Sequence, residues 1–167
     1  MSQGDQMSGV VVRPVNFADP SQAGAFVDLI DMYATDPMGG GQPLSDEVKA
    51  RLPRDLANSH AGIHLIAWHA EEAVGLLNAF MGYSTFKARP LINIHDIAVV
   101  PAWRGRGVGQ ALLSNLQDIA LQRGCCKLTL EVLSGNTKAR FAYERFGFED
   151  YALDPKLGAA QFMQKWL

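Results

Sequence analysis

The spacing of apolar residues predicts that strands and helices alternate along most of the chain. A β-branched run at Val10–Val12 predicts a first strand. Apolar residues at helical spacing follow the capping pair Asp19-Pro20 and predict a helix up to Asp36, and Ser45 caps a second helix. Short turns separate the next three apolar runs, which predicts an antiparallel meander of strands over residues 62–69, 73–86 and 91–100.

The second half of the chain returns to alternation. A stripe of apolar residues every three or four positions predicts a helix over Val108–Gln122. A strand over Lys127–Leu133, a helix over Asn136–Phe146 and one or two final strands in the tail to Leu167 complete the prediction. Without internal repeats, this order predicts one mixed α/β (α+β) domain over residues 10–167, behind a polar tail, residues 1–9, that we expect to be disordered.

Composition narrows the class of protein. A chain of 167 residues with 48% hydrophobic residues can form one domain with a sizeable core. The net charge of −2 gives no global reason to bind nucleic acid or an anionic membrane, and no apolar run approaches the ~20 residues of a membrane helix. The only cysteines, Cys125 and Cys126, are neighbours and seldom reach disulfide geometry, so a reduced, cytoplasmic setting is expected. His60 and His64 have metal-ligand spacing for a helix, but Gly62 favours a strand, so no metal is expected.

A glycine-rich turn between a strand and a helix is the most informative segment. Its glycines, Gly105, Gly107 and Gly109, let the backbone approach a ligand, and the following helix start favours an anion. A solvated helix start with a basic edge would give the same pattern. Gln110 stands where the dinucleotide fingerprint needs glycine, and no Gly-Lys-Ser/Thr completes a P-loop.

The remaining pattern, Arg104-x-x-Gly107-x-Gly109, resembles the acyl-CoA pyrophosphate loop of the GNAT superfamily of N-acetyltransferases. A second segment agrees with it: Asn136-x-x-Ala139-x-x-x-Tyr143, with Gly147-Phe148 four residues later, is similar to another motif of this superfamily. Its apolar members share one helical face, and Gly147 suits the helix end.

The resemblance implies a GNAT fold, with a mostly antiparallel sheet whose central strand splays from its neighbour at a bulge. It implies acetyl-CoA as co-substrate, with the pantetheine arm on the backbone of residues 97–99, the pyrophosphate on the loop, and Asn136 near the pantetheine. The implied acetyl-CoA residues are Ile97, Ala98, Val99, Arg104, Gly105, Arg106, Gly107, Val108, Gly109, Gln110, Asn136, Ala139 and Tyr143.

Three residues are expected to act in catalysis. Tyr143 is expected to donate a hydrogen bond to the departing sulfur; a core tyrosine is the alternative. Many relatives carry Glu-Asp where this chain has His95-Asp96, so the identity of the base stays open. Imidazole has a free pKa of about 6.5, which suits a base, so His95 is expected to act directly or through water; a packed histidine is the alternative. Strict alternation would send His95 and Asp96 to opposite faces, and a bulge would bring both to one site.

Charge distribution points to the acceptor. Residues 19–47 hold six acidic residues and no lysine or arginine, whereas residues 101–147 hold seven basic and three acidic residues. The acidic segment suits a small cationic amine, although a solvated helical face would look the same. Residues 82–91 look similar to spermidine/spermine and thialysine acetyltransferases. An acyl-CoA sensor without turnover and an enzyme for protein N-termini or lysines stay open, as does a homodimer.

Overall fold

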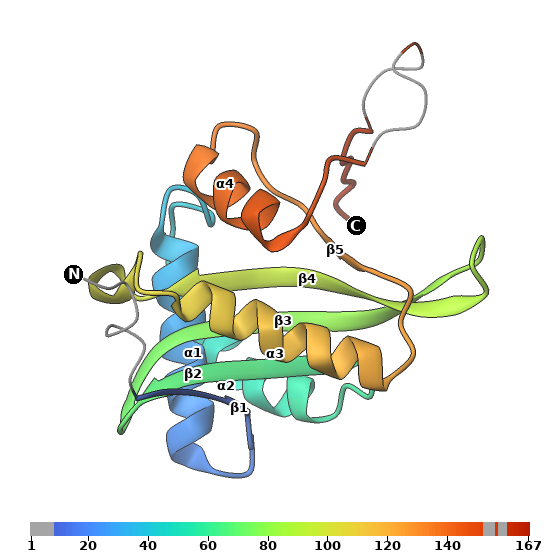
Figure 1. Ribbon diagram of the computed structural model, residues 1–167. Helices are drawn as coiled ribbons and strands as arrows, with labels where there is room; N and C mark the ends of the chain where they lie inside the picture. Colours follow the sequence, from blue (N-terminus) through green and yellow to red (C-terminus); the bar gives the residue numbers. More distant parts are fainter. Residues whose placement is uncertain (1–8, 152–155, 157–159) are drawn as a thin grey trace. The chain divides into compact units, whose positions relative to one another are not determined.

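The structure is a computed structural model that describes residues 9–151, 156 and 160–167 (Figure 1). Two compact units divide the chain, Met1–Leu130 and Glu131–Leu167. The polar tail predicted at residues 1–9 lies outside the described residues except for Gly9. In the described part, no helix combines the length and the apolar character needed to cross a membrane.

A five-stranded sheet forms the centre of the first unit. Its strands lie in chain order: β1 (Val10–Pro14), β2 (Gly62–His69), β3 (Glu72–Ser84), β4 (Arg89–Val99) and β5 (Leu128–Leu130). The first four strands pair antiparallel and β4 pairs parallel with β5, so the predicted meander is confirmed. β5 is shorter than the predicted strand, because its pairing with β4 covers only residues 128–130.

Three α-helices pack on this sheet: α1 (Pro20–Thr35), α2 (Asp46–Ala57) and α3 (Val108–Gln122). The predicted caps are present, because the Asp19 carboxylate accepts from the Ser21 N–H at 2.9 Å and the Ser45 hydroxyl accepts from the Val48 N–H at 3.3 Å. Helices α1 and α2 lie on one face of the sheet and α3 on the other (Figure 1). A short 3₁₀ helix, η1 (Pro101–Trp103), connects β4 to the glycine-rich turn.

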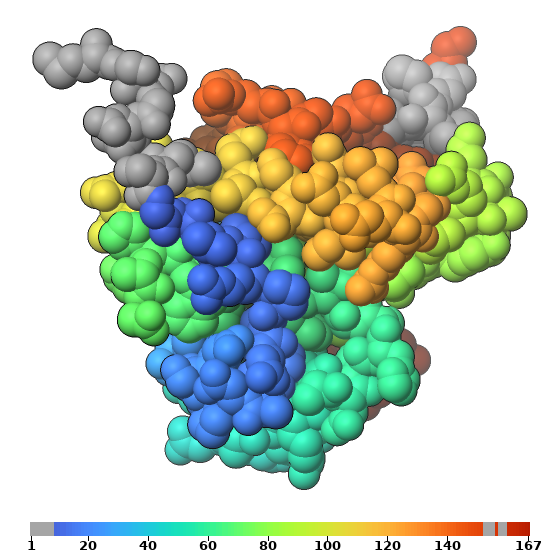
Figure 2. Space-filling model, turned by 60° about the horizontal axis from the view of Figure 1, so that its bottom comes forward, coloured from blue at the N-terminus to red at the C-terminus, as the bar shows by residue number. Residues whose placement is uncertain are grey.

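Alternation along β3 separates the two sides of the core. Leu76 packs with Phe26 and Ile30 of α1, whereas a Cβ at Gly75 would touch Val108 and Leu112 of α3. Even-numbered residues from Leu76 to Phe80 therefore face α1, and odd-numbered residues from Gly75 to Ala79 face α3. β1 is an edge strand of the sheet and lies at the surface next to α3 (Figure 2).

The second unit contains α4 (Thr137–Phe146). The Asn136 side chain caps it by accepting from the Ala139 N–H at 3.2 Å, and Gly147 ends it at φ +107°, as predicted. The final strands predicted in the tail are wrong for residues 147–151, 156 and 160–167, where no strand forms, since a strand needs a neighbour to share its backbone hydrogen bonds. The rest of that tail lies outside the described residues.

Candidate active site

A β-bulge interrupts β4 at His95. Asp96 pairs with Asn78 of β3, but Ala79, the next residue of β3, pairs with Ile94. His95 is therefore the extra residue of the bulge, and its side chain is exposed. The bulge lies in the strand where the resemblance implies one.

The bulge brings His95 and Asp96 to the same face of the sheet. The Asp96 carboxylate accepts a hydrogen bond from the Asn78 amide, between Oδ2 and Nδ2, at 2.7 Å. The His95 ring lies 4.9 Å from the Phe80 ring, centroid to centroid. Asn78 and Phe80 are two residues apart on β3 and share the face toward α1, so both side chains of the His95-Asp96 pair reach that face.

Beyond the bulge, β4 continues without β5. β5 pairs only with residues 92–94, so no described strand lies on that side of Ile97 or Val99. The Val100 N–H donates to the Val74 carbonyl, and hydrogen bonding alternates along an antiparallel pair. The backbone groups of Ile97 and Val99 therefore face the open side. Those of Ala98 face β3, and its side chain is buried in the core with Phe26, so Ala98 offers no backbone group to a ligand at the open side.

The glycine-rich turn follows directly after this open segment. Gly105 and Gly107 have φ values of +75° and +86°, which favour glycine, and Gly107 is the N-cap residue of α3. Among the described residues no side chain caps α3, and the backbone N–H groups of Val108 and Gly109 lie in its first turn, where an intrahelical acceptor is lacking, as an anion site requires. Val108 is buried on the sheet, whereas Gly109 and Gln110 are half-buried in the first turn.

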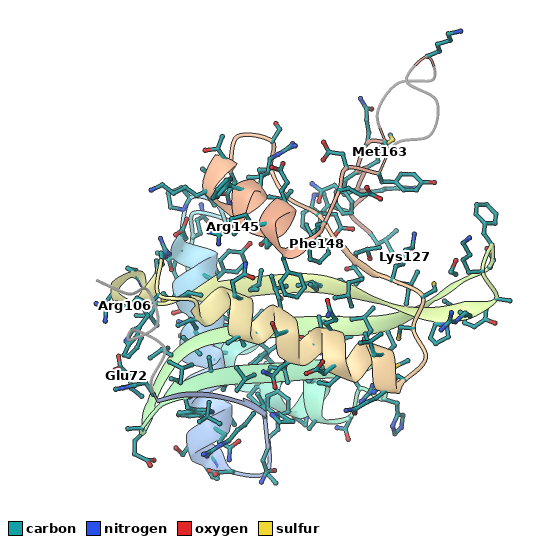
Figure 3. The ribbon with its side chains drawn as sticks, viewed as in Figure 1. Glu72, Arg106, Lys127, Arg145, Phe148 and Met163 are labelled. Atoms are coloured by element: carbon teal, nitrogen blue, oxygen red, sulfur yellow. The ribbon has the colours of Figure 1, made fainter. Side chains whose placement is uncertain are left out.

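The two arginines of the turn take different directions. Arg104 reaches toward α1, where its guanidinium contacts the Asp36 carboxylate at 3.1 Å and its Nε donates to the Val99 carbonyl at 3.0 Å. Arg106 lies over the Trp103 ring, 5.2 Å from its centroid, at the end of α3 where the helix begins (Figure 3). Arg104 therefore fixes the turn to the end of α1, whereas the Arg106 guanidinium stays beside the turn on the ring of Trp103.

The end of α1 adds a tyrosine and a carboxylate near Asp96. Burial raises the pKa of Tyr33, and the negative charges of Asp96 and Asp36 raise it further. Asp36 itself is engaged: the Met38 backbone N–H and the Arg104 guanidinium hold its pKa below the usual range. In the described part of the chain no lysine or arginine forms an ion pair with Asp96. The Asp96 carboxylate therefore differs from that of Asp36, whose charge is paired with Arg104.

Most of the acidic residues that pointed to a cationic acceptor have structural partners. Asp19 caps α1, and Asp31 binds the Lys49 amine and the Leu44 N–H, each at 2.7 Å. Glu47 pairs with Arg51 on the surface of α2. These charges stabilise local structure, so the acidic composition of residues 19–47 by itself says little about the acceptor.

Sequence reasoning missed Asn78 and the role of His64 beside it. Asn78 is 8% exposed and is the one buried polar residue among those described, and its Oδ1 lies 2.7 Å from the His64 Nδ1. The available signal was a polar residue in each of two otherwise apolar runs. Without the register of β2, β3 and β4, nothing connected those residues to Asp96.

Asn136, Ala139 and Tyr143 belong to the second unit. Ala139 and Tyr143 lie on the half-buried face of α4, as predicted. The Tyr143 ring contacts the Phe148 ring at 5.9 Å, and the Phe148 N–H donates to the Tyr143 carbonyl at 3.0 Å. Figure 3 labels Phe148 just beyond the end of α4. The side-chain oxygen Oδ1 of Asn136 accepts the capping hydrogen bond, which leaves the side-chain nitrogen Nδ2 to donate to another group.

The side chains that could bind a metal are spread over the described part of the chain, and its two cysteines are free thiols. No three His, Cys, Asp or Glu side chains gather there in a group that could hold a metal. Cys125 and Cys126 are not bonded to each other, and burial raises the pKa of the Cys125 thiol, which lowers its reactivity.

The site combines a bulged strand with an open side, a glycine-rich turn and the start of a helix. A known protein family shares these motifs. A model of the acetyltransferase (GNAT) family matches residues 26–148. The chain belongs to this family. It is an acetyltransferase, with the mixed α/β fold that the motifs of the loop and of α4 predicted.

Individual relatives share between about a fifth and two fifths of their aligned residues with this chain. An uncharacterized N-acetyltransferase, YhfO, of Bacillus subtilis is 33% identical over 139 residues, which cover 80% of this chain and 87% of that protein. Thialysine N-ε-acetyltransferase of Bos taurus is 38% identical over 71 residues, covering 42% of this chain and 41% of that enzyme. The solved structure of AAC(6')-Iy with a CoA bisubstrate analog has a TM-score of 0.76 at 18% identity, covering 96% of this chain and all of that one (100%).

Proposed function

We propose that this GNAT acetyltransferase transfers an acetyl group from acetyl-CoA to a primary amine of a small cationic acceptor, by direct attack of the amine. The observation that carries the proposal is the bulge of β4, which presents Asp96 and His95 together beside the open backbone of Ile97 and Val99. Acetyl-CoA supplies the activated acyl group, as a thioester. The residues of the chain bind both substrates and move a proton.

Asp96 is the proposed binding group for the amine. Its carboxylate has a neutral amide as partner, so a cationic acceptor would compensate its charge. The carboxylates of Asp96 and Asp36 also raise the pKa of Tyr33, which supports a negative potential on this face that favours a cation. Relatives whose names specify thialysine or streptothricin acetylation are consistent with an amine acceptor.

His95 is the proposed general base. An ammonium group must lose a proton before it attacks, and an exposed imidazole one residue from Asp96 can accept that proton directly or through water. The proton is then released to solvent, to which His95 is open. Asp96 binds the amine while His95 accepts its proton, so both residues act on the nitrogen atom of the acceptor.

Backbone groups and the glycine turn are proposed to hold the co-substrate. The N–H and carbonyl groups of Ile97 and the N–H of Val99 can pair with the amide groups of a pantetheine arm, and an N–H there can donate to the oxygen that gains negative charge. Gly105, Gly107, Gly109, Val108 and Gln110 at the start of α3 offer backbone donors for a pyrophosphate, with Arg106 beside them. Arg104, which pairs with Asp36, fixes this turn in place.

Tyr143, with Asn136 and Ala139 of the same motif, completes the proposal from the second unit. A phenol with a free pKa of about 10 donates a hydrogen bond to a departing thiolate, but it transfers its proton only incompletely, because the thiol that would form has a lower pKa of about 8.5. The hydrogen bond rather than full proton transfer is therefore the proposed contribution of the Tyr143 hydroxyl.

Thiol release from acetyl-CoA tests the proposal directly. Purified protein would be incubated with polyamines, lysine analogues, aminoglycosides, amino acids and short peptides, each against a control without acceptor. Release above the control with one class of small cationic amine supports the proposal and assigns the acceptor class. Release only with peptides would replace it with protein acetylation, and binding of acetyl-CoA without release would replace it with a sensor role.

The assignment of the base has its own test. His95→Ala should lower kcat and remove the ionisation on the acidic side of the pH–rate profile. A pH–rate profile identical to that of the wild type would exclude His95 as the base.

A further inference from the structure

We propose that His64 and Asn78 are positioning residues, which hold the Asp96 carboxylate in the orientation that receives the acceptor amine. The inference rests on the amine-binding role proposed above for Asp96. Neither residue belongs to the motifs of the loop or of α4, and both lie inside the sheet rather than at its open side.

Three strands place these residues in one row. His64 of β2 pairs with Asn78 of β3, and Asn78 pairs with Asp96 of β4. The two hydrogen bonds that join them, His64 Nδ1 to Asn78 Oδ1 and Asn78 Nδ2 to Asp96 Oδ2, are both 2.7 Å long. Directly opposite residues on neighbouring strands share a face, so the row runs across the sheet from the core to the bulge.

The donors and acceptors in this row fit together in one way. An ionised carboxylate only accepts hydrogen bonds, so the Asn78 amide must direct its nitrogen toward Asp96. Its oxygen then faces His64, whose Nδ1 must carry the proton and donate it. Burial lowers the pKa of His64, so its ring is neutral at pH 7 and carries one N–H. The imidazole thereby fixes which way the amide faces.

The other ring nitrogen agrees with this assignment. Nε2 of His64 is buried and has no hydrogen-bond partner in the part of the chain that the structure describes. A bare ring nitrogen tolerates that position better than an N–H, because the missing proton leaves no donor unsatisfied. Nε2 lies against the backbone of Gly62, where a Cβ would collide with it.

Aromatic contacts hold the imidazole so that it can direct the amide. The rings of Phe17, Phe26 and Phe80 contact it edge-on, at centroid distances of 5.3, 5.8 and 5.8 Å. Phe80 also contacts the ring of His95. One half-buried imidazole thus supports both residues of the bulge, Asp96 through Asn78 and His95 through Phe80.

Two substitutions at His64 separate hydrogen bonding from packing. His64→Phe keeps an aromatic ring among the three phenylalanines and removes the Nδ1 donor. His64→Asn offers an amide nitrogen where Nδ1 stands and removes the ring. If His64 is only structural, the variant that keeps the ring, His64→Phe, should be the more active one. If His64 positions Asp96, the variant that keeps a hydrogen-bond donor, His64→Asn, should be the more active one.

The expected results follow from that separation. His64→Phe should lower kcat/KM for the amine by about 10- to 100-fold, as small misplacements of a reacting group do. The KM for acetyl-CoA should stay within about twofold, because Ile97, Val99 and the glycine turn are untouched. His64→Asn should recover most of kcat/KM although its melting temperature falls below that of His64→Phe. Wild-type kcat/KM in His64→Phe, or activity that follows the melting temperature, would overturn the proposal.

A spectroscopic measurement tests the row without any turnover. In ¹⁵N-labelled wild-type protein, long-range ¹H–¹⁵N correlation should show His64 as the Nδ1–H tautomer at pH 7.5. In Asp96→Ala the amide has no carboxylate to face, so the Nε2–H tautomer should gain population. An Nε2–H tautomer in the wild type, or a tautomer unaffected by Asp96→Ala, would contradict the row.

These readouts distinguish the two proposals. If no amine is acetylated but the tautomer responds to Asp96→Ala, the proposed function fails and the row stands. If amines are acetylated and both His64 variants keep the wild-type kcat/KM, the function stands and the positioning role fails.

Discussion

The two faces of β3 serve different purposes. Toward α3 the strand presents Gly75, Leu77 and Ala79, and the two side chains are fully buried against apolar neighbours. Toward α1 it begins with Leu76 in the core but continues with Asn78 and Phe80, which contact Asp96 and His95 of the bulge. The same strand thus holds the fold together on one side and supports the candidate site on the other.

This difference shows where function enters the fold. The α3 face keeps strict alternation and apolar packing, which stabilise the sheet in proportion to the area buried. The α1 face accepts a buried amide, a neutral histidine and an irregular neighbouring strand. A buried polar group costs stability unless it is hydrogen-bonded, and the two bonds from His64 to Asp96 pair the His64 Nδ1 and both ends of the Asn78 amide.

The largest effect is expected on the α3 face. Leu77→Ala should lower the free energy of unfolding by about 3 kcal/mol, more than 100-fold in the unfolding equilibrium, because it leaves a cavity under α3. Urea denaturation measures the loss. At a temperature where the variant is folded its kcat should equal that of the wild type; a large loss of kcat there would show that the two faces are not separate.

The next largest effect is expected on the α1 face, where a substitution should lower activity and leave stability nearly unchanged. Asp96→Asn keeps an oxygen that can accept from Asn78, removes the negative charge and replaces the second oxygen with an NH2 group of similar size. It should lower kcat/KM for the amine about 100-fold with little change in the urea midpoint. Asp118→Asn, at an exposed position of α3, is the matched control and should leave both quantities unchanged. Equal activity of the two variants would remove Asp96 from the site.

Tyr143→Phe tests whether the second unit contributes to the chemistry. The variant keeps the ring that packs on Phe148 and loses the hydroxyl. Turnover should fall by about tenfold or more, as expected when a proton or hydrogen-bond donor is lost, while acetyl-CoA binding measured by calorimetry stays nearly intact. Unchanged turnover would exclude the Tyr143 hydroxyl from the mechanism.

The smallest effect is a pH dependence of stability from His64. Burial lowers its pKa below 6.5 in the folded protein, so on acidification the unfolded chain takes up the proton first. The stability that the neutral ring provides is complete above pH 6.5 and is lost as the pH falls below it. Urea midpoints at about pH 7.5 and 5.5 should differ more in the wild type than in His64→Phe. If the difference between the two urea midpoints is the same in both proteins, a group other than His64 causes the pH dependence.

Periodicity predicted most of the fold because the core obeys it. The helix over Val108–Gln122 has the predicted ends, and the three long strands agree to within a few residues. The prediction of final strands is wrong at the described residues of the tail, where Phe162 and Trp166 are exposed and no neighbouring strand shares the backbone hydrogen bonds.

The candidate site could be predicted where it depends on local sequence. The glycine turn and the caps at Asn136 and Gly147 are set by nearby residues, and they have the expected backbone conformations. The bulge at His95, the direction of Arg104 toward Asp36 and the row from His64 to Asp96 depend on pairing between distant segments. No local pattern encodes that register, so only the structure reveals them.

The central claim is that the face around Asp96 and His95 acetylates a primary amine. Mass spectrometry of the acceptor, after incubation with acetyl-CoA and wild-type protein, tests it most directly. The account predicts one acetyl group on a primary amine of a small cation, and none on an analogue with hydroxyl in place of that amine. Acetyl-CoA that binds while every small amine is recovered unmodified would contradict it.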